Sequence, residues 1–441
     1  MSTSSIEINK QFQQALNGIE SRKNLFITGK AGTGKSTLLK LFRQRAKRKV
    51  VVLAPTGVAA LNVGGETIHS FFGFKPDITA QKIKKLKGQR ARLYKEIDAI
   101  IIDEASMVRA DLMDHIDRFL RLNGGSCELA FGGVQMVLIG DLYQLPPVVS
   151  FSEKDIFATQ YESPYFFDSN VFRDNPMEIV ELEKIYRQKD QRFIELLNAI
   201  RNNTVTEEQL KILNLRVGAK LSTDGSANYS VHLTPTNAMA AEINAEHLRA
   251  LKANVHDYPA GILGGFERRA YPADQNLQLA QGAQVMLLNN DSAGRWVNGT
   301  LGRVDKIEPD NEAGQDVVLV QLSDGSKEEV RPYSWDIFHF TFNPQTRSIE
   351  TETLGSFTQY PLKLAWAVTI HKSQGKTFDR VAIDMGRGAF AHGQTYVALS
   401  RCTSMEGMTL AKPMQKTDIW TDWRIVRFMS NTRIEIPQLQ S

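Results

Sequence analysis

Short apolar runs separated by polar, glycine-containing stretches dominate the first part of the chain. Four of them are Leu25–Thr28, Val50–Ala54, Ala99–Ile102 and Val134–Ile139, and helical stretches lie between them. Near-continuous apolar strands that alternate with helices are typical of a parallel sheet covered on both faces. We therefore predict an α/β domain whose ligand-binding residues lie in the polar loops that follow these strands.

The α/β pattern returns later, with a strand predicted at Val231–Thr234 and a helix at Asn237–Leu251. From about residue 253 to residue 356 the pattern changes to short β-type runs separated by Asn-Gly and Asp-Gly turn signals. We predict that this stretch is a small antiparallel β domain inserted into a second α/β domain, which resumes near Phe357.

Composition adds little beyond this fold class. Hydrophobic residues make up 42% and charged residues 23% of the chain, which is ordinary for globular proteins. Neither an apolar run of about 18–20 residues nor a signal or transit peptide is evident, so we expect no membrane segment. The two cysteines, Cys127 and Cys402, provide no disulfide framework or zinc site. A reducing compartment is expected, and we predict a cytoplasmic protein.

Basic residues are concentrated in one segment, although the net charge is only +4. Between Lys82 and Lys95 the chain carries seven basic residues and no acidic one. Such a run is consistent with a solvated helix face or with contact to nucleic acid.

Residues Gly29–Ser36 fit the pattern G-x-x-x-x-G-K-[ST], between an apolar run and a helical stretch. In such a loop, glycines allow backbone N–H groups to approach phosphates, and the following helix adds its positive end. We predict that the loop binds ATP and Mg²⁺, with Lys35 reaching the β- and γ-phosphates and the Ser36 hydroxyl binding Mg²⁺.

Two further strand ends carry candidate catalytic residues. Asp103 and Glu104 close the third apolar run, so Asp103 is a candidate Mg²⁺ partner and Glu104 a candidate base for the attacking water. The alternative is an exposed turn. Gln144, in the loop after the fourth run, is a candidate sensor of the γ-phosphate, and the alternative is a proline-stiffened loop without such a role.

Arg187 and Arg401 are candidates for neutralising charge on the transferring phosphoryl group. Both lie beyond the first 180 residues, so this role requires ATP to bind between two domains. The alternative for either arginine is a surface salt bridge.

Taken in order, these motifs resemble those of the superfamily 1B DNA helicases, and specifically the Pif family. The matching segments in the first half are Phe26–Ser36, Ala54–Ala60, Thr67–Phe72, Ile102–Met107, Phe131–Gln135 and Gly140–Pro147. Those in the second half are Tyr186–Gln188, Thr234–Asn237, Val297–Thr300, Thr369–Thr377 and Gly393–Arg401. The stretch Asp111–Arg121 and the Phe-Gly-Gly-x-Gln segment after it are what favours the Pif family over other superfamily 1B groups.

The resemblance implies a fold of two RecA-like domains with ATP between them, and 5′-to-3′ translocation on single-stranded DNA with duplex unwinding. The expected domains are 1–180 (with a strand-separating insertion at about 66–95), 181–252 continued by 357–441, and the inserted small β-barrel at 253–356. The basic residues of the insertion would then contact phosphates at the fork.

The resemblance also assigns binding residues. For ATP these are Gln11, which would read adenine, and Gly29, Lys30, Ala31, Gly32, Thr33, Gly34, Lys35, Ser36, Thr37 and Gly375. For DNA they are Pro55, Thr56, His69, Phe71, Thr234, Asn298, His371 and Lys372. The alternative for Gln11 is a polar position on an N-terminal helix, and the alternative for Phe71 is a core position.

The chain is close to the minimal core of the family, which favours a bacterial or phage source. We expect a monomer in solution that acts in DNA repair, recombination or replication. Duplex and forked DNA are the expected substrates, and G-quadruplexes and DNA–RNA hybrids are further candidates. Two alternatives stay open: an ATPase acting on RNA or protein, and a DNA-binding module that ATP switches without unwinding.

Overall fold

The computed structural model describes residues 8–434 except 47, 76–77, 150–156, 189, 222–228, 267 and 311–313. The chain forms two compact units. The first comprises the described residues up to Tyr186, together with Ile337–Leu354 and the segment from Trp423 onward. The second comprises Arg187–Asp336 and Gly355–Asp422. The chain therefore passes from one unit to the other four times.

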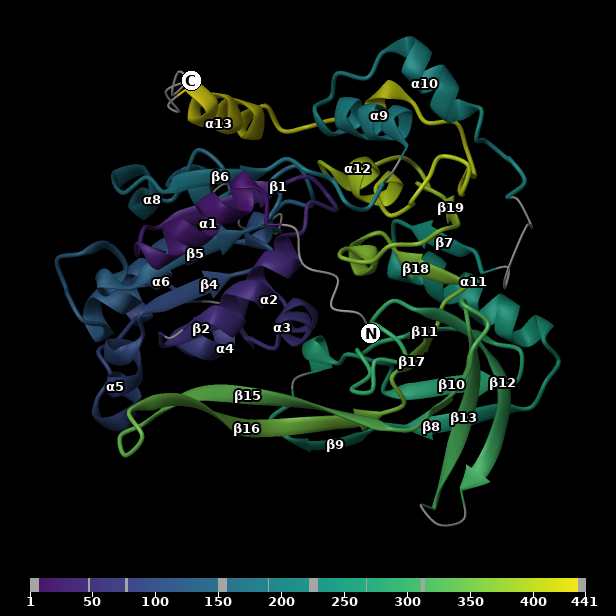
Figure 1. Ribbon diagram of the computed structural model, residues 1–441, viewed down its shortest axis with the longest axis horizontal. Helices are drawn as coiled ribbons and strands as arrows, with labels where there is room; N and C mark the ends of the chain where they lie inside the picture. The colour runs from purple at the N-terminus through teal and green to yellow at the C-terminus, as the bar shows by residue number, and fades with distance from the viewer. Residues whose placement is uncertain are drawn as a thin grey trace. The chain divides into compact units, whose positions relative to one another are not determined.

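The first unit is built on a six-stranded sheet in the order β3-β2-β4-β5-β1-β6, with parallel pairing throughout (Figure 1). Its strands are β1 (Leu25–Gly29), β2 (Val50–Ala54), β3 (Glu66–Thr67), β4 (Ala99–Ile102), β5 (Gln135–Ile139) and β6 (Glu178–Leu182). The four apolar runs are thus strands of one parallel sheet, as predicted.

Both faces of this sheet are covered, because successive strand residues join different clusters. Leu25 and Ile27 pack with Phe12 of α1 and Leu38 of α2, whereas Phe26 joins the cluster on the opposite face. The helices of this unit are α1 (Lys10–Glu20), α2 (Lys35–Arg45), α3 (Gly57–Val63), α4 (Ile68–Phe72), α5 (Gly88–Glu96), α6 (Ala110–Asn123), α8 (Asn170–Asp174) and α13 (Trp423–Ile434). Short 3₁₀ turns are η1 (Ala80–Lys82), η2 (Ala105–Met107), η3 (Ala130–Gly133) and η5 (Phe166–Asp168).

Two segments from late in the chain complete the core of the first unit. Phe340 packs edge-on against Phe71, with ring centroids 6.0 Å apart, and the Phe340 N–H donates to the carboxylate of Glu66. Phe428 of α13 stacks on Phe167 at 4.3 Å. These contacts explain why both segments belong to the first unit although sequence places them beside the second.

The second unit contains a four-stranded parallel sheet in the order β18-β7-β19-β20. Its strands are β7 (Val231–Thr234), β18 (Ala367–Thr369), β19 (Val381–Ile383) and β20 (Met408–Leu410). Its helices are α9 (Gln191–Arg201), α10 (Glu207–Asn214), α11 (Asn237–Ala250) and α12 (Gln394–Leu399), with short turns η6 (Arg268–Ala270), η7 (His371–Ser373) and η8 (Lys416–Asp418). The predicted strand before Asn237 and the helix after it are present.

Antiparallel strands occupy the segment between α11 and β18. They are β8 (Val255–Pro259), β9 (Gly261–Gly264), β10 (Asn276–Ala280), β11 (Gln284–Leu287), β12 (Leu301–Asp310), β13 (Gln315–Leu322), β14 (Lys327–Val330), β15 (Tyr333–Asn343), β16 (Ser348–Gln359) and β17 (Leu362–Leu364). The antiparallel pairing agrees with the prediction. The distal half of the β15–β16 hairpin differs from it, because its residues pack in the first unit.

No helix in the described part of the chain is long and apolar enough to cross a membrane.

Candidate nucleotide and nucleic-acid sites

The glycine loop connects β1 to α2 at the carboxyl edge of the first sheet. The Lys35 ammonium donates to the carbonyl oxygens of Gly29 (2.7 Å) and Lys30 (3.0 Å), so the side chain folds back over the loop. The backbone N–H of Tyr186 donates to the Gly32 carbonyl at 2.8 Å, which ties the loop to the chain after β6. Together these bonds hold a cationic ammonium beside a helix N-terminus, an arrangement suited to phosphate binding.

Two glycines of the loop cannot carry a side chain. A Cβ on Gly29 would lie 2.6 Å from the Leu182 carbonyl oxygen. Gly34 has φ +88° and abuts Phe12, where a Cβ would lie 3.0 Å from the ring. The glycine positions of the motif therefore follow from close backbone packing in this fold.

The acidic pair ends the strand β4, which neighbours β5 and through it β1. Burial raises the pKa of the Asp103 carboxyl, against the opposing effects of the Glu104 backbone N–H and the Lys35 ammonium. Glu104 adopts φ +51°, an uncommon conformation for a residue with a side chain. Backbone strain of this kind tends to occur at functional sites, where surrounding structure enforces it.

The loop after β5 packs directly against the residues that follow the acidic pair. A Cβ on Gly140 would lie 2.9 Å from the backbone nitrogen of Ala105. Gln144 is buried, and its side-chain amide faces the Asp141 carboxylate at 3.4 Å. The three loops that carry Lys35, Asp103 and Gln144 thus leave neighbouring strands at one sheet edge.

The residues at this edge fit a magnesium ion. The Ser36 hydroxyl opens α2 and the Asp103 carboxylate ends β4, and both are hard oxygen donors of the kind Mg²⁺ prefers. Within the described residues, no group of three or more His, Cys, Asp or Glu side chains could hold a metal ion by itself. Mg²⁺ is commonly held by one or two protein oxygens together with nucleotide phosphates, and Ser36 and Asp103 could supply those oxygens.

Gln11 lies on α1 in the same unit as the glycine loop. Its side-chain amide donates to the Glu183 carboxylate at 2.9 Å, just after β6. The bond fixes the orientation of the amide, which leaves the carbonyl oxygen of Gln11 as the group that could accept from a ligand.

Both candidate arginines lie in the second unit and converge on Ser400. Arg187 donates to the Ser400 carbonyl at 3.3 Å, and burial lowers the pKa of its guanidinium. Arg401 is 1% exposed and donates to the Ser400 hydroxyl (2.9 Å) and to the carbonyl oxygens of Val397 (2.9 Å) and Lys376 (3.1 Å). Because Arg401 is buried, the alternative of a surface salt bridge is excluded for this residue. Gly375, the ATP-binding candidate of this unit, is exposed one residue before Lys376.

The predicted DNA-facing residues divide by exposure. In the first unit Thr56 is exposed, and Pro55 and His69 are half-buried. In the second unit Lys372 is exposed, and Asn298 and His371 are half-buried.

Phe71 and Thr234 are fully buried, which corrects their expected role as side chains facing DNA. The Phe71 ring packs against Phe72, Tyr94 and Phe340, and the Thr234 hydroxyl donates to the Thr236 carbonyl at 3.2 Å. We therefore assign Phe71 to the core and Thr234 to strand packing.

Three lysines of the second unit form a group that sequence reasoning only partly anticipated. Desolvation, together with repulsion from Lys376 and Lys372, lowers the pKa of Lys363 to about 7. Desolvation also lowers the pKa of Lys376 to about 8, and its ammonium donates to the Asn298 side chain. A bound anion such as phosphate would offset the mutual repulsion of these ammonium groups. A lysine within the apolar strand β17 was the signal that could have identified Lys363.

Comparison with known proteins identifies the family. A family model described as PIF1-like helicase matches residues 5–211. The chain is 34% identical to ATP-dependent DNA helicase PIF1 of Mus musculus, over 93% of this chain and 61% of the mouse protein. It is 33% identical to ATP-dependent DNA helicase Pif1 of Bdellovibrio bacteriovorus, over 92% of this chain and 88% of that protein. This chain belongs to the PIF1-like helicase family.

Solved structures agree with the PIF1-like assignment. A Bacteroides sp Pif1 in complex with ADP-AlF4 is 37% identical and matches with a TM-score of 0.88, over 98% of both chains. Bacteroides Pif1 bound to ssDNA is 38% identical, with a TM-score of 0.71 and the same coverage. The two parallel sheets are therefore those of two RecA-like domains. The chain spans less than two thirds of the length of the mouse relative.

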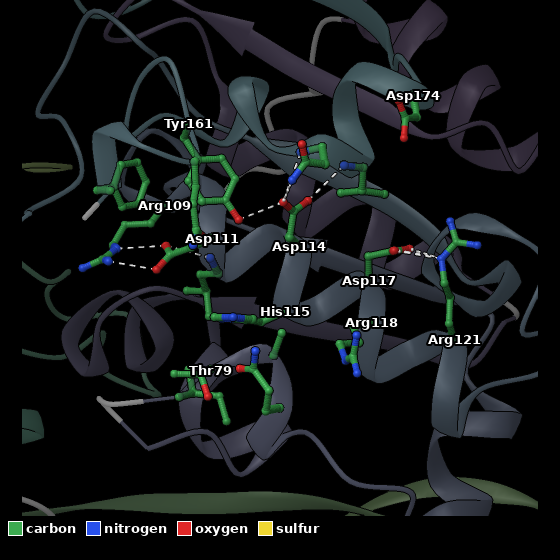
Figure 2. Close-up of a pocket in the computed structure, with 18 of the residues that line it drawn as sticks. Thr79, Arg109, Asp111, Asp114, His115, Asp117, Arg118, Arg121, Tyr161 and Asp174 are labelled. Carbon is green, nitrogen blue, oxygen red and sulfur yellow. Dashed lines mark hydrogen bonds and ion pairs between the residues drawn. The ribbon is translucent and has the colours of Figure 1, made fainter. Parts of the chain in front are cut away.

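The stretch that favoured the PIF1-like family in the sequence is the acidic face of α6 (Figure 2). It lines a cavity of about 720 Å³ within the first unit. Asp114 accepts from the Tyr161 hydroxyl (2.9 Å) and the Val171 N–H (2.9 Å), and Asp117 accepts from Arg121 (2.8 Å) and the Phe131 N–H (2.6 Å). These carboxylates already bind groups of the protein, so they tie α6 to neighbouring segments.

The same helix holds the basic segment in place. The side chain of Asn123 accepts from the Leu86 N–H at 2.6 Å and donates to the Lys84 carbonyl at 3.2 Å. In this PIF1-like chain, α6 thus positions the lysines that were predicted to contact phosphates.

The Phe-Gly-Gly turn beside α6 provides a stability prediction. Gly132 has φ +65°, and a Cβ there would lie 2.3 Å from the Leu120 carbonyl oxygen of α6. Gly132→Ala is expected to lower the free energy of unfolding by about 2–4 kcal/mol, because it adds both strain and a backbone clash. Denaturant or thermal unfolding measures this. Gly125→Ala is the matched control, since its nearest neighbour would be at 3.5 Å; equal effects of the two variants would contradict the packing argument.

Proposed function

We propose that this chain is an ATP-dependent DNA helicase that moves 5′ to 3′ along single-stranded DNA and unwinds duplexes. The observation that carries the proposal is the convergence of Lys35, Asp103 and Gln144 at one sheet edge, in a chain of the PIF1-like family. The relatives that match it are named ATP-dependent DNA helicases. The 5′-to-3′ direction rests on the resemblance of the motifs.

In this proposal the first unit binds ATP through the loop Gly29–Ser36. Lys35 leaves the loop carbonyls and contacts the β- and γ-phosphates, and the Ser36 hydroxyl and Asp103 hold Mg²⁺, which would supply positive charge to the phosphates. Glu104 orients and deprotonates the attacking water, and the buried Gln144 responds to the γ-phosphate.

The arginines of the second unit supply the remaining charge. Arg187 and Arg401 neutralise the transferring phosphoryl group, as an arginine finger does. Both donate to Ser400, Arg187 to its carbonyl and Arg401 to its hydroxyl, so one residue connects the two side chains.

The strand-binding residues in this proposal are Pro55, Thr56 and His69 in the first unit, and Asn298, His371 and Lys372 in the second. Single-stranded DNA and forked duplexes are the proposed partners, and a monomer is the proposed solution state. Among the described residues both cysteines are unpaired, which is compatible with a reducing cytoplasmic compartment.

One experiment tests the proposal against its alternatives. ATP turnover is measured with single-stranded DNA, with single-stranded RNA and without nucleic acid, and unwinding is measured on duplexes with a 5′ or a 3′ tail. We expect stimulation by DNA and unwinding from the 5′ tail. Stimulation by RNA alone would favour an RNA-directed ATPase, and stimulation without unwinding would favour an ATP-switched binding module. Unwinding from the 3′ tail alone would refute the direction.

Lys372 provides a salt-dependence prediction for strand binding. Its side chain is exposed beside His371, where an ammonium can neutralise a phosphate. Lys372→Ala is expected to weaken binding evenly across sequences and to reduce the slope of log K against log salt by about 0.7. Titrations of an oligonucleotide at several salt concentrations measure the slope. Lys211→Ala, which removes an exposed lysine on α10, is the control and should leave the slope unchanged.

A further inference from the structure

Phe390 presents a large apolar ring to solvent next to a predicted strand-binding residue. The residue is 61% exposed, in a loop between β19 and α12. Its ring is nearly parallel to the imidazole of His371, with centroids 6.1 Å apart and an angle of 13° between the planes. Neither the catalytic residues nor the phosphate-binding lysines require an exposed phenyl ring at this position.

The exposure is enforced by the fold. The Phe390 N–H donates to the side-chain oxygen of Gln394 at 3.0 Å, and Gln394 is fully buried. The N–H of Gly386 donates to the Asp384 carboxylate at 2.8 Å, which forms a local turn at the start of the loop. Gly388 has φ +113°, a conformation that a residue with a side chain rarely adopts. Part-buried hydrogen bonds and a glycine thus hold the backbone of the loop on which the exposed Phe390 ring is carried.

Two exposed basic residues lie near Phe390 and His371 in the sequence. Lys372 follows His371 directly, and Arg387 lies three residues before Phe390, and both are exposed. Aromatic faces that alternate with cationic side chains are the combination by which proteins bind single-stranded nucleic acid, because bases stack on the rings and phosphates contact the cations.

We propose that Phe390, together with His371, forms a nucleobase-stacking site on the single-stranded DNA path. The occupant is a nucleobase of the bound strand, with little preference for its identity, because every base has a π-face. This inference rests on the proposed function, since it requires that the chain bind single-stranded DNA.

The position of the ring also connects it with the arginines. Gln394, which holds the Phe390 backbone, is the first residue of α12, and this helix ends at Leu399, directly before Ser400 and Arg401. A base stacked on Phe390 would therefore rest on the loop that leads into α12, the helix that ends two residues before Arg401.

The contribution of base stacking to affinity is distinguished from that of phosphate contact by comparing a strand that has bases with one that lacks them. Binding of a fluorescent oligothymidylate and of an abasic oligonucleotide of equal length is measured by anisotropy for the full chain, Phe390→Ala and Phe390→Trp. We expect Phe390→Ala to weaken binding of the base-bearing strand about tenfold and to leave the abasic strand unaffected. Phe390→Trp should restore affinity and show quenched tryptophan emission on the base-bearing strand only.

Trp423→Ala is the matched control, because Trp423 is an aromatic of equal exposure (62%) in the first unit. The thermal midpoint of each variant establishes that it is folded. Equal loss on both strands, or no loss on either, would overturn the stacking site while leaving the helicase proposal intact. Failure of the unmodified chain to bind either strand would overturn the proposed function and the inference with it.

Discussion

Replacing Lys35 with alanine is expected to reduce ATP turnover by at least about a hundredfold, the usual effect of removing one charge-stabilising donor from an active site. The reason is geometric: its ammonium lies over the glycine loop, bound to the Gly29 and Lys30 carbonyls. Lys35 is the first residue of α2, whereas Lys30, the other lysine of the loop, lies five positions before that helix begins. Steady-state hydrolysis with saturating single-stranded DNA measures the loss.

Affinity for single-stranded DNA should persist in the Lys35 variant, because the proposed strand-binding residues lie elsewhere. Lys40→Ala is the matched control, since Lys40 is on the same helix and exposed. Normal turnover in Lys35→Ala would remove this lysine from the mechanism.

Replacing Arg401 with alanine is expected to have the second large effect, a fall in turnover of about 10³-fold or more with a much smaller change in ATP affinity. A guanidinium that meets the phosphoryl group mainly in the transition state contributes to kcat and little to ground-state binding. Separate measurement of kcat and of nucleotide affinity, with DNA present, tests this.

Arg401 also has structural bonds, so its variant needs controls. The side chain donates to the carbonyls of Val397 and Lys376, so its loss removes both bonds, although the Val397 carbonyl still accepts from the Ser400 hydroxyl. Arg401→Lys keeps the charge and loses the planar geometry, so it should stay folded and remain impaired. Arg249→Ala, on the surface of α11, should behave like the unmodified chain. A change confined to ATP affinity would make Arg401 a binding residue only.

The sequence predicted the parts of the fold that depend on local pattern. The strands around Ile27, Ile101 and Val137 were recognisable because strands buried on both faces read as continuous apolar runs. The glycine loop was recognisable by its motif, and the structure explains the first glycine of that motif, because backbone packing allows no side chain at Gly29.

The sequence was less informative where a long-range contact determines the environment. Phe71 lies within a motif of DNA-facing residues, yet its ring is covered by Phe340, which is 269 positions later in the chain (340 minus 71). The lowered pKa of Lys363 was likewise not predictable from local sequence, because it depends partly on Lys372 and Lys376. Phe390 was overlooked because an isolated phenylalanine in a Gly- and Ala-containing loop has no spacing signal.

The four passages of the chain between units limit how the protein can be divided. Glu66 is buried, and its carboxylate contacts the His339 imidazole at 3.1 Å and accepts from the Phe340 N–H at 3.2 Å. A fragment that stops near Tyr186 would lack both groups, together with the Phe428 ring. Such a truncation would open the hydrophobic core at Phe71 and Phe167 and leave a buried carboxylate partly unpaired. Deletion analysis based on linear domain boundaries would therefore yield an incomplete ATP-binding half, prone to aggregation.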